Sequence, residues 1–208
     1  MNKRTILYTM ILFFSGCLAR EAQMNKPVVY IILGSTRDGR LSDKIGKTII
    51  KLIDVHEVCA EIIDLRDYPL PFLADAVPPA DRKVITDPAV KKWSDKIKQA
   101  DAFIIVAPEY NAGYPGVLKN ALDSLYVEWN NKPVALVTYS GGPSGGARVY
   151  AQLKEVLTHG LKMVLAPKHI MIPSSYKAFN ADGSLADRSI EKQINEIIKQ
   201  LQGALKKK

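Results

Sequence analysis

The 208-residue sequence contains few of the residues that build metal sites or disulfide frameworks. Only two cysteines occur, Cys17 and Cys59, and only three histidines, His56, His159 and His169. None of them lie at the spacing of metal ligands. Cys59 falls in the apolar run VCAEIIDL, which predicts a small core residue. The sequence therefore gives no indication of a metal site.

The excess of basic over acidic residues is also small. The formal net charge is +8, and residues 1–23 hold three basic and one acidic residue, which leaves +6 for the remainder. No stripe of arginine and lysine interleaved with aromatic residues accompanies this charge, so nucleic acid is not predicted as a partner. With 47% hydrophobic and 24% charged residues, the chain has an ordinary globular composition and enough length for one domain. The charge indicates a mild preference for anionic small molecules.

Residues 1–23 are expected to lie outside the fold, as a signal-like segment or an over-extended start. A basic start, an apolar stretch from Ile6 to Phe14 and small residues before Cys17 are typical of a secretory signal. FSGC also resembles a lipoprotein cleavage box, although leucine is usual where Phe14 stands. The stretch is too short to span a bilayer comfortably. Because MNK recurs at Met24, directly before the first predicted strand, translation from Met24 is the alternative.

From Pro27 onward, apolar runs of strand length alternate with segments of helical periodicity. Five such strands and five helices predict a parallel sheet with helices on both faces. Ligands bind outside the carboxyl ends of the strands in such sheets, so the loops after the first, third and fourth strands are expected to carry the chemistry. The predicted strands are 27–34, 58–65, 102–111, 133–140 and 162–172, and the predicted helices are 42–56, 87–100, 115–129, 147–160 and 189–207.

The loop after the first strand, GSTRDGRLS, does not match two familiar nucleotide-binding motifs. Gly34 and Gly39 have the spacing of a Walker A loop, but Arg40 and Leu41 follow where that loop needs lysine and a hydroxyl residue. A Rossmann dinucleotide site needs a glycine where Thr36 stands. Neither a nucleoside triphosphate nor a dinucleotide is therefore predicted at this loop.

A single terminal phosphate fits this loop better. Ser35, Thr36 and Ser42 can donate hydroxyl hydrogen bonds, and Arg37 can donate charge-assisted ones. The first turn of the following helix supplies free N–H groups. A plain strand-to-helix turn with Ser42 as N-cap is the alternative.

Two further loops point to a family. PEYNAGYPGVLKNALD (108–123) and YSGGPSGGAR (139–148), together with the first loop, resemble the signature stretches of the NADPH-dependent FMN reductases, a flavodoxin-like group that includes quinone, azo and chromate reductases. The resemblance extends in order over nearly all of residues 27–200. One departure is that Ser124-Leu125 replaces a tryptophan that often follows the second stretch. The resemblance implies an α/β fold, a flavodoxin-like three-layer sandwich with a five-stranded parallel sheet, and a single FMN-binding reductase domain over residues 24–208.

The resemblance also implies the cofactor contacts. Ser35, Arg37 and Ser42 are expected on the FMN 5′-phosphate, with the N–H groups of Arg40 and Leu41 nearby. Because the flavin carries the reaction, no catalytic side chain is expected. The contacts implied for the flavin ring come from backbone at Pro108, Glu109, Tyr110 and Asn111 and from Ser140, Gly141 and Gly142.

The implied activity is that of an FMN-dependent oxidoreductase. NADPH or NADH would reduce the flavin, which would then reduce a small-molecule acceptor (free flavin, a quinone, an azo compound or a metal oxyanion) in a ping-pong reaction. The alternative is a flavodoxin-like electron carrier without its own NAD(P)H activity. Such carriers tend to be acidic and to shield the flavin with loop aromatics, whereas this chain is basic and lacks such a pair.

Assembly and location follow from the same resemblance. Family members form homodimers and often homotetramers, and Tyr114, Trp129 and the segment 66–88 are the candidate interface residues. The need for reduced nicotinamide favours a start at Met24 and a cytoplasmic enzyme. A lipoprotein anchored to a membrane through Cys17 is the alternative if Met1 is the true start.

Overall fold

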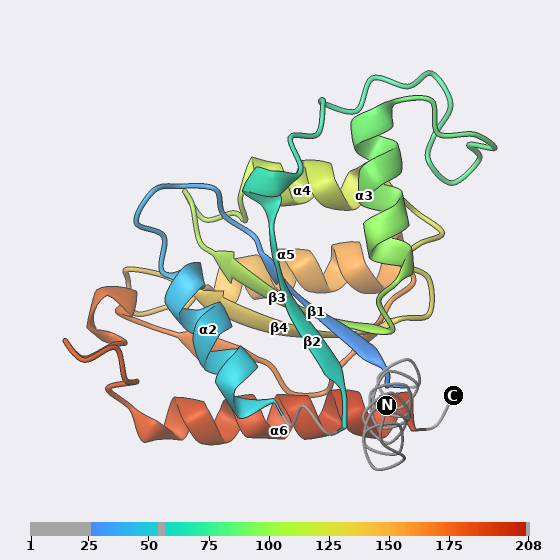
Figure 1. The fold of residues 1–208 in the computed structure, drawn as a ribbon. Coiled ribbons are helices and arrows are strands. Elements are labelled where there is room, and N and C mark those ends of the chain that lie inside the picture. The colour runs from blue at the N-terminus through green and yellow to red at the C-terminus, as the bar shows by residue number, and fades with distance from the viewer. Residues whose placement is uncertain (1–25, 54–56, 207–208) are drawn as a thin grey trace, which may run out of the picture.

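The computed structural model describes residues 26–53 and 57–206, so the signal-like segment 1–23 and His56 lie outside the described residues. A parallel sheet forms the centre, with the strand order β2-β1-β3-β4-β5 and a sixth short strand that also pairs with β4. This confirms the predicted α/β flavodoxin-like sandwich (Figure 1). The strands are β1 (Val28–Leu33), β2 (Cys59–Asp64), β3 (Ala102–Pro108), β4 (Pro133–Tyr139), β5 (Val164–Leu165) and β6 (Ile170–Ile172).

The last strand differs from the prediction. Residues 162–172 form two short strands instead of one, and both pair in parallel with β4. Leu165 lies opposite Val134 and Ile170 lies opposite Val137, so five steps along this segment match three along β4. Pro167 lies in the interruption, where its missing N–H removes one ladder hydrogen bond.

Helices cover both faces of the sheet, as Figure 1 shows: α2 and α6 pack on one face, and α3, α4 and α5 on the other. Each helix places an apolar stripe on the buried strands, which accounts for the near-continuous hydrophobic runs in β3 and β4. The helices are α2 (Ser42–Leu52), α3 (Pro88–Lys98), α4 (Gly116–Asp123), α5 (Ala147–Glu155, continued by a π-helical turn to Gly160) and α6 (Arg188–Leu205).

The starts of α3 and α2 are capped differently, and the alternative of Ser42 as an N-cap is wrong. Asp87 is the N-cap of α3, where its carboxylate accepts from the N–H groups of Ala89 and Val90. Ser42 is not the N-cap of α2, because Leu41 occupies that position and Ser42 is the first helical residue. The hydroxyl of Ser42 is therefore not used to cap the helix.

The core on the α3–α5 face contains an aromatic cluster. Trp93, Trp129 and Phe103 are fully buried there, with ring centroids 6.1 Å apart between the two tryptophans and 5.1 Å apart between Phe103 and Trp129. Trp129 donates its indole N–H to the carbonyl of Leu122. The expectation that Trp129 lies at a subunit interface is therefore wrong for this residue, because it has no exposed surface.

The long segment before α3 is held at both ends of its exposed stretch. The Asn120 side chain donates to the carbonyl of Pro71 at 2.9 Å and accepts from the N–H of Leu73 at 3.3 Å. Arg82 bonds to Asp75 and to a backbone carbonyl at the end of α4. Asn120 therefore orients this segment.

Candidate active site

The loops after β1, β3 and β4 meet at the carboxyl edge of the sheet, as the topology predicts. The first two of these loops and the end of β4 line a cavity of about 270 Å³. From the predicted site residues, the cavity collects Arg37, Arg40, Leu41, Pro108 and Tyr110. It is also lined by Tyr139, Ser175 and Tyr176, which are not among the predicted site residues. Ser175 and Tyr176 follow β6, far along the chain, so only the folded topology brings them to this site.

The first loop leaves β1 through Gly34, a position where a side chain would be crowded. The N–H of Gly34 donates to the carbonyl of Val106 at 2.8 Å. A Cβ at this position would lie 2.9 Å from a methyl carbon of Leu118 and 3.0 Å from that same carbonyl oxygen. Glycine therefore allows β1 and β3 to continue side by side up to the edge of the site.

Ser42 carries the clearest sign of a missing ligand. Its side-chain oxygen is buried and has no hydrogen-bond partner among the described residues. Such orphaned groups are costly and call for an explanation. The N–H group of Leu41, at the start of α2, also has no backbone partner in the described part of the chain, and a helix start favours anions. This donor set fits the phosphate of FMN.

Tyr139 lies at the end of β4, beside Ser42. Burial raises the pKa of Tyr139 to about 12, and the neighbouring Ser42 hydroxyl opposes this rise without reaching hydrogen-bond geometry. The phenol is consequently protonated at neutral pH and keeps an O–H to donate. Tyr139 is thus a further candidate donor to a ligand in the cavity.

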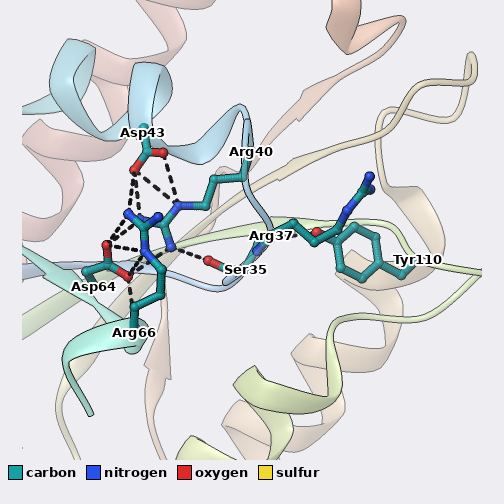
Figure 2. A network of polar contacts seen from close by, with 7 residues as sticks. All are labelled: Ser35, Arg37, Arg40, Asp43, Asp64, Arg66 and Tyr110. Carbon is teal, nitrogen blue, oxygen red and sulfur yellow. Dashed lines mark hydrogen bonds and ion pairs between the residues drawn. The ribbon is translucent and has the colours of Figure 1, made fainter. Parts of the chain in front are cut away.

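Arg37 and Tyr110 join the first and second loops. The guanidinium carbon of Arg37 lies 5.5 Å from the centre of the Tyr110 ring. The Tyr110 hydroxyl is 2.6 Å from the Ser35 hydroxyl, which in turn accepts from the N–H of Arg37 at 3.3 Å. Figure 2 shows Arg37 turned toward Tyr110 and away from the ion pairs on the other side of the loop. Arg37 is exposed, so its charge remains available to a phosphate.

Arg40 points to the opposite side of the same loop. Its side chain is only 1% exposed and contacts Asp43, Asp64 and the carbonyl of Ser35 (Figure 2). Its own N–H donates to the carbonyl of Arg37 at 3.3 Å and closes a turn in which Gly39 has φ +69°. The N–H groups of Arg40 and Leu41 are both expected near the phosphate, and of the two only that of Leu41 has no backbone partner among the described residues.

The second loop forms a tight turn. The N–H and carbonyl groups of Tyr110 and Gly113 bond reciprocally, at 2.8 and 3.0 Å. Between them, Asn111 and Ala112 have φ values of +50° and +64°, as a two-residue turn of the primed type requires. Left-handed backbone at non-glycine residues is costly and clusters at functional sites.

This turn limits which backbone N–H groups of residues 108–111 are free to bind a ligand. Pro108 has no N–H, the N–H of Glu109 donates to the carbonyl of Tyr139 at 2.9 Å, and that of Tyr110 is used by the turn. Within the described residues, the amides without partners are those of Asn111 and Ala112 at the tip.

Glu109 is held in place by the third loop and α5. One carboxylate oxygen accepts from Arg148 at 2.8 Å and the other accepts from the Ser144 hydroxyl at 3.3 Å. The Glu109 side chain is 9% exposed, whereas that of Arg148 is 62% exposed. Arg148 therefore fixes Glu109, a connection that the spacing of the two residues in sequence did not reveal.

The glycines of the third loop serve two different purposes. A Cβ at Gly141 or Gly142 would meet nothing within 4 Å, so no neighbouring atom crowds these two positions. Gly145 and Gly146 have φ values of +60° and +86°, and a Cβ at either position would approach other atoms within 3 Å. Ser140 donates its hydroxyl to the carbonyl of Gly142 at 3.0 Å and so fixes the bend of the loop.

Comparison with known proteins agrees with this site. A family model described as NADPH-dependent FMN reductase matches residues 27–177. The chain is 42% identical to an NAD(P)H-dependent FMN reductase of Schizosaccharomyces pombe, over 68% of this chain and 70% of that protein. It is 33% identical to a quinone reductase of Escherichia coli, over 83% of this chain and 85% of that protein.

A solved structure gives the same assignment. The flavoenzyme FerB, an NAD(P)H:(acceptor) oxidoreductase from Paracoccus denitrificans, superimposes with a TM-score of 0.70 at 29% identity and covers 87% of this chain and 98% of its own. Because the family model spans most of the chain and these relatives align over two thirds of it or more, the chain belongs to the NADPH-dependent FMN reductase family, with FMN as its cofactor and oxidoreduction as its activity.

Proposed function

We propose that the chain is an NAD(P)H-dependent FMN oxidoreductase that reduces a small-molecule acceptor such as a quinone. FMN, when bound, would supply the redox chemistry, so the residues of the chain need to position the flavin rather than act as a nucleophile or base. The buried, unpartnered hydroxyl of Ser42, beside the free amide of Leu41 and the available charge of Arg37, carries this proposal. The relatives named as FMN and quinone reductases support the choice of substrates.

In this proposal each loop has one task. The first loop binds the phosphate through Ser35, Arg37, Leu41 and Ser42. The turn closed by the N–H of Arg40 supports these residues. The second and third loops hold the flavin ring, through Pro108, Glu109, Tyr110 and Asn111 on one side and Ser140, Gly141 and Gly142 on the other. Of these groups, the free amide of Asn111 would be available to stabilise negative charge on the flavin ring.

Anaerobic reduction of the purified, FMN-loaded protein tests the activity. Addition of NADPH or NADH alone is expected to bleach the flavin absorbance, and a quinone added afterwards should restore it. An electron carrier would stay yellow until a separate reductase was added. Persistent absorbance with both nicotinamides would therefore contradict the proposal and favour the carrier.

Arg37→Ala tests the phosphate assignment. A hydrogen bond to a charged group contributes about 1.5–3 kcal/mol. At about 1.4 kcal/mol per factor of ten, the variant should bind FMN roughly ten- to a hundredfold more weakly. Riboflavin has no phosphate, so its affinity should barely change. Titration of the apo-protein with each flavin, followed by flavin fluorescence, measures both values.

Lys199→Ala is the matched control, because it removes one exposed positive charge from α6 without disturbing an ion pair in the described residues. It should leave both affinities unchanged. Equal weakening of FMN and riboflavin in Arg37→Ala would show that Arg37 does not contact the phosphate.

We also propose that the protein is a homodimer or homotetramer. The segment before α3 presents an apolar surface, with Phe72 86% exposed and Val84 70% exposed. Single apolar side chains on a surface are normal, but a group of them on one segment indicates an interaction site. Leu73 and Val77 belong to the same exposed group. Sedimentation velocity of the purified protein tests this assembly, and a monomer at micromolar concentration would contradict it.

The domain limits and the location are further proposals. Residues 24–208 would form one FMN-binding reductase domain that acts in the cytoplasm, where reduced nicotinamide is available. Among residues 26–53 and 57–206, no helix combines the length and apolar character that a membrane span requires. N-terminal sequencing of the native protein tests the location, and a lipid-modified Cys17 as first residue would overturn it.

A further inference from the structure

We infer that Arg40 is a positioning residue for the cofactor phosphate: its buried side chain ties the two ends of the first loop to the end of β2, without lending a net charge to the ligand. This inference rests on the proposed FMN site. It concerns a side chain that points away from the cavity-facing donors of the loop (Figure 2).

One guanidinium group holds three separate parts of the chain. Arg40 donates to the carbonyl of Ser35, where the loop begins, and to both carboxylate oxygens of Asp43 at 3.1 Å, in the first turn of α2. It also donates to Asp64, at 2.9 Å to one carboxylate oxygen, where β2 ends. Ser35 and Ser42 are the two hydroxyl residues proposed to bind phosphate, and each lies at or next to one of these attachment points. The spacing of the two hydroxyls is therefore set by Arg40.

The charges of the network cancel. Arg66 donates to Asp64 at 2.7 and 2.9 Å, so two arginines face two aspartates. Partial burial tends to raise the pKa of Asp64, but the hydrogen bonds from Arg40 and Arg66 outweigh it and hold this pKa well below its usual range. Asp64 is accordingly ionised at neutral pH. Two arginines thus face two aspartates, and the formal charges of the four groups sum to zero. Arg37, which has no acidic partner in the described residues, remains the cation for the phosphate.

Asp64→Asn separates position from charge, because the two roles predict changes of opposite sign. The substitution keeps the size of the side chain but removes one negative charge, so the network gains a net charge of +1 near the ligand. If Arg40 acted through charge, FMN would bind more tightly. If Arg40 acts by position, the loosened loop should weaken FMN by about tenfold or more. Riboflavin, which needs no phosphate loop, should change by less than about twofold.

The measurement is a paired titration of apo-protein with FMN and riboflavin, and the ratio of the two dissociation constants is the readout. A merely structural role would weaken both flavins and leave this ratio unchanged. Asp95→Asn is the matched control, since Asp95 forms an exposed ion pair with Lys91 on α3, away from the site. It should leave the ratio at the wild-type value.

Arg40→Lys provides a second test if Asp64→Asn does not fold. Lysine keeps the charge but lacks the planar fork that reaches three partners at once. Weaker FMN binding with unchanged riboflavin binding would support the inference, whereas an unchanged ratio, or tighter FMN binding in Asp64→Asn, would overturn it. A wild-type protein that binds FMN no better than riboflavin would instead refute the proposed phosphate site itself, which keeps the two failures distinct.

Discussion

Replacement of Gly146 by alanine is expected to destabilise the fold by about 2–6 kcal/mol and to abolish FMN binding at ordinary cofactor concentrations. Gly146 precedes α5 with φ +86°, and an alanine in that backbone region is strained. The added Cβ would also lie 2.7 Å from the Thr138 Cβ and 3.0 Å from the Tyr139 N–H nitrogen, which belong to the rigid strand β4. The third loop would have to move, and with it the surface proposed for the flavin ring. Urea unfolding followed by circular dichroism gives the stability, and flavin titration gives the affinity.

Gly203→Ala is the matched control for this experiment. Gly203 lies in α6, exposed, and a Cβ there would meet nothing within 4 Å. Alanine is favoured over glycine in a helix, so this variant should be stabilised by up to about 1 kcal/mol and bind FMN normally. The same chemical change thus gives effects of opposite sign at the two positions. A Gly146→Ala protein with wild-type stability and affinity would show that the third loop can rearrange freely.

Trp93→Ala should cost about 3–5 kcal/mol of stability, a large part of the total for a domain of this size. Trp93 is fully buried on α3, and its indole N–H donates to the carbonyl of Ala121 on α4 at 2.9 Å. Its ring packs against Tyr68 and Trp129, with centroids 4.9 and 6.1 Å away. Removal of the ring leaves a cavity between α3 and α4 and an unpaired carbonyl. The midpoint of urea unfolding, followed by circular dichroism, measures the loss.

Trp93→Phe divides this cost between packing and hydrogen bonding. Phenylalanine restores most of the apolar volume but cannot donate to Ala121, so the expected loss is about 1–3 kcal/mol. Equal losses in the two variants would mean that the hydrogen bond, and not the packing, dominates at this position.

The sequence predicts the layered fold well because parallel strands buried on both faces are apolar throughout. β3 and β4 have no polar alternation that could suggest another arrangement, and the helices between them show clear periodicity. Because the carboxyl ends of parallel strands meet at the same edge of a sheet, the sequence also places the loops after β1, β3 and β4 together. The apolar run 162–172 predicts one strand and not the break between β5 and β6, although the missing N–H of Pro167 interrupts the ladder there.

The candidate site is predicted less completely, because side-chain direction depends on distant partners. Arg37 and Arg40 look equivalent in the string GSTRDGRLS, yet one lies over Tyr110 and the other pairs with Asp64 from β2. Asp64 ends its own strand, and nothing in the local sequence around it indicates its pairing with Arg40. Tyr176 enters the cavity from beyond β6, and no local pattern marks it.

The placement of the two tryptophans has a spectroscopic consequence. Trp93 and Trp129 are the chain's only tryptophans, and both belong to the aromatic cluster between the sheet and the α3–α5 layer. The core beneath α2 and α6 contains no tryptophan. Tryptophan fluorescence consequently reports the unfolding of the α3–α5 layer. It does not report the unfolding of the α2–α6 layer. If the α2–α6 layer melts first, the far-ultraviolet ellipticity will fall while the emission maximum stays in place, and the gap between the two curves will measure how independently the layers unfold.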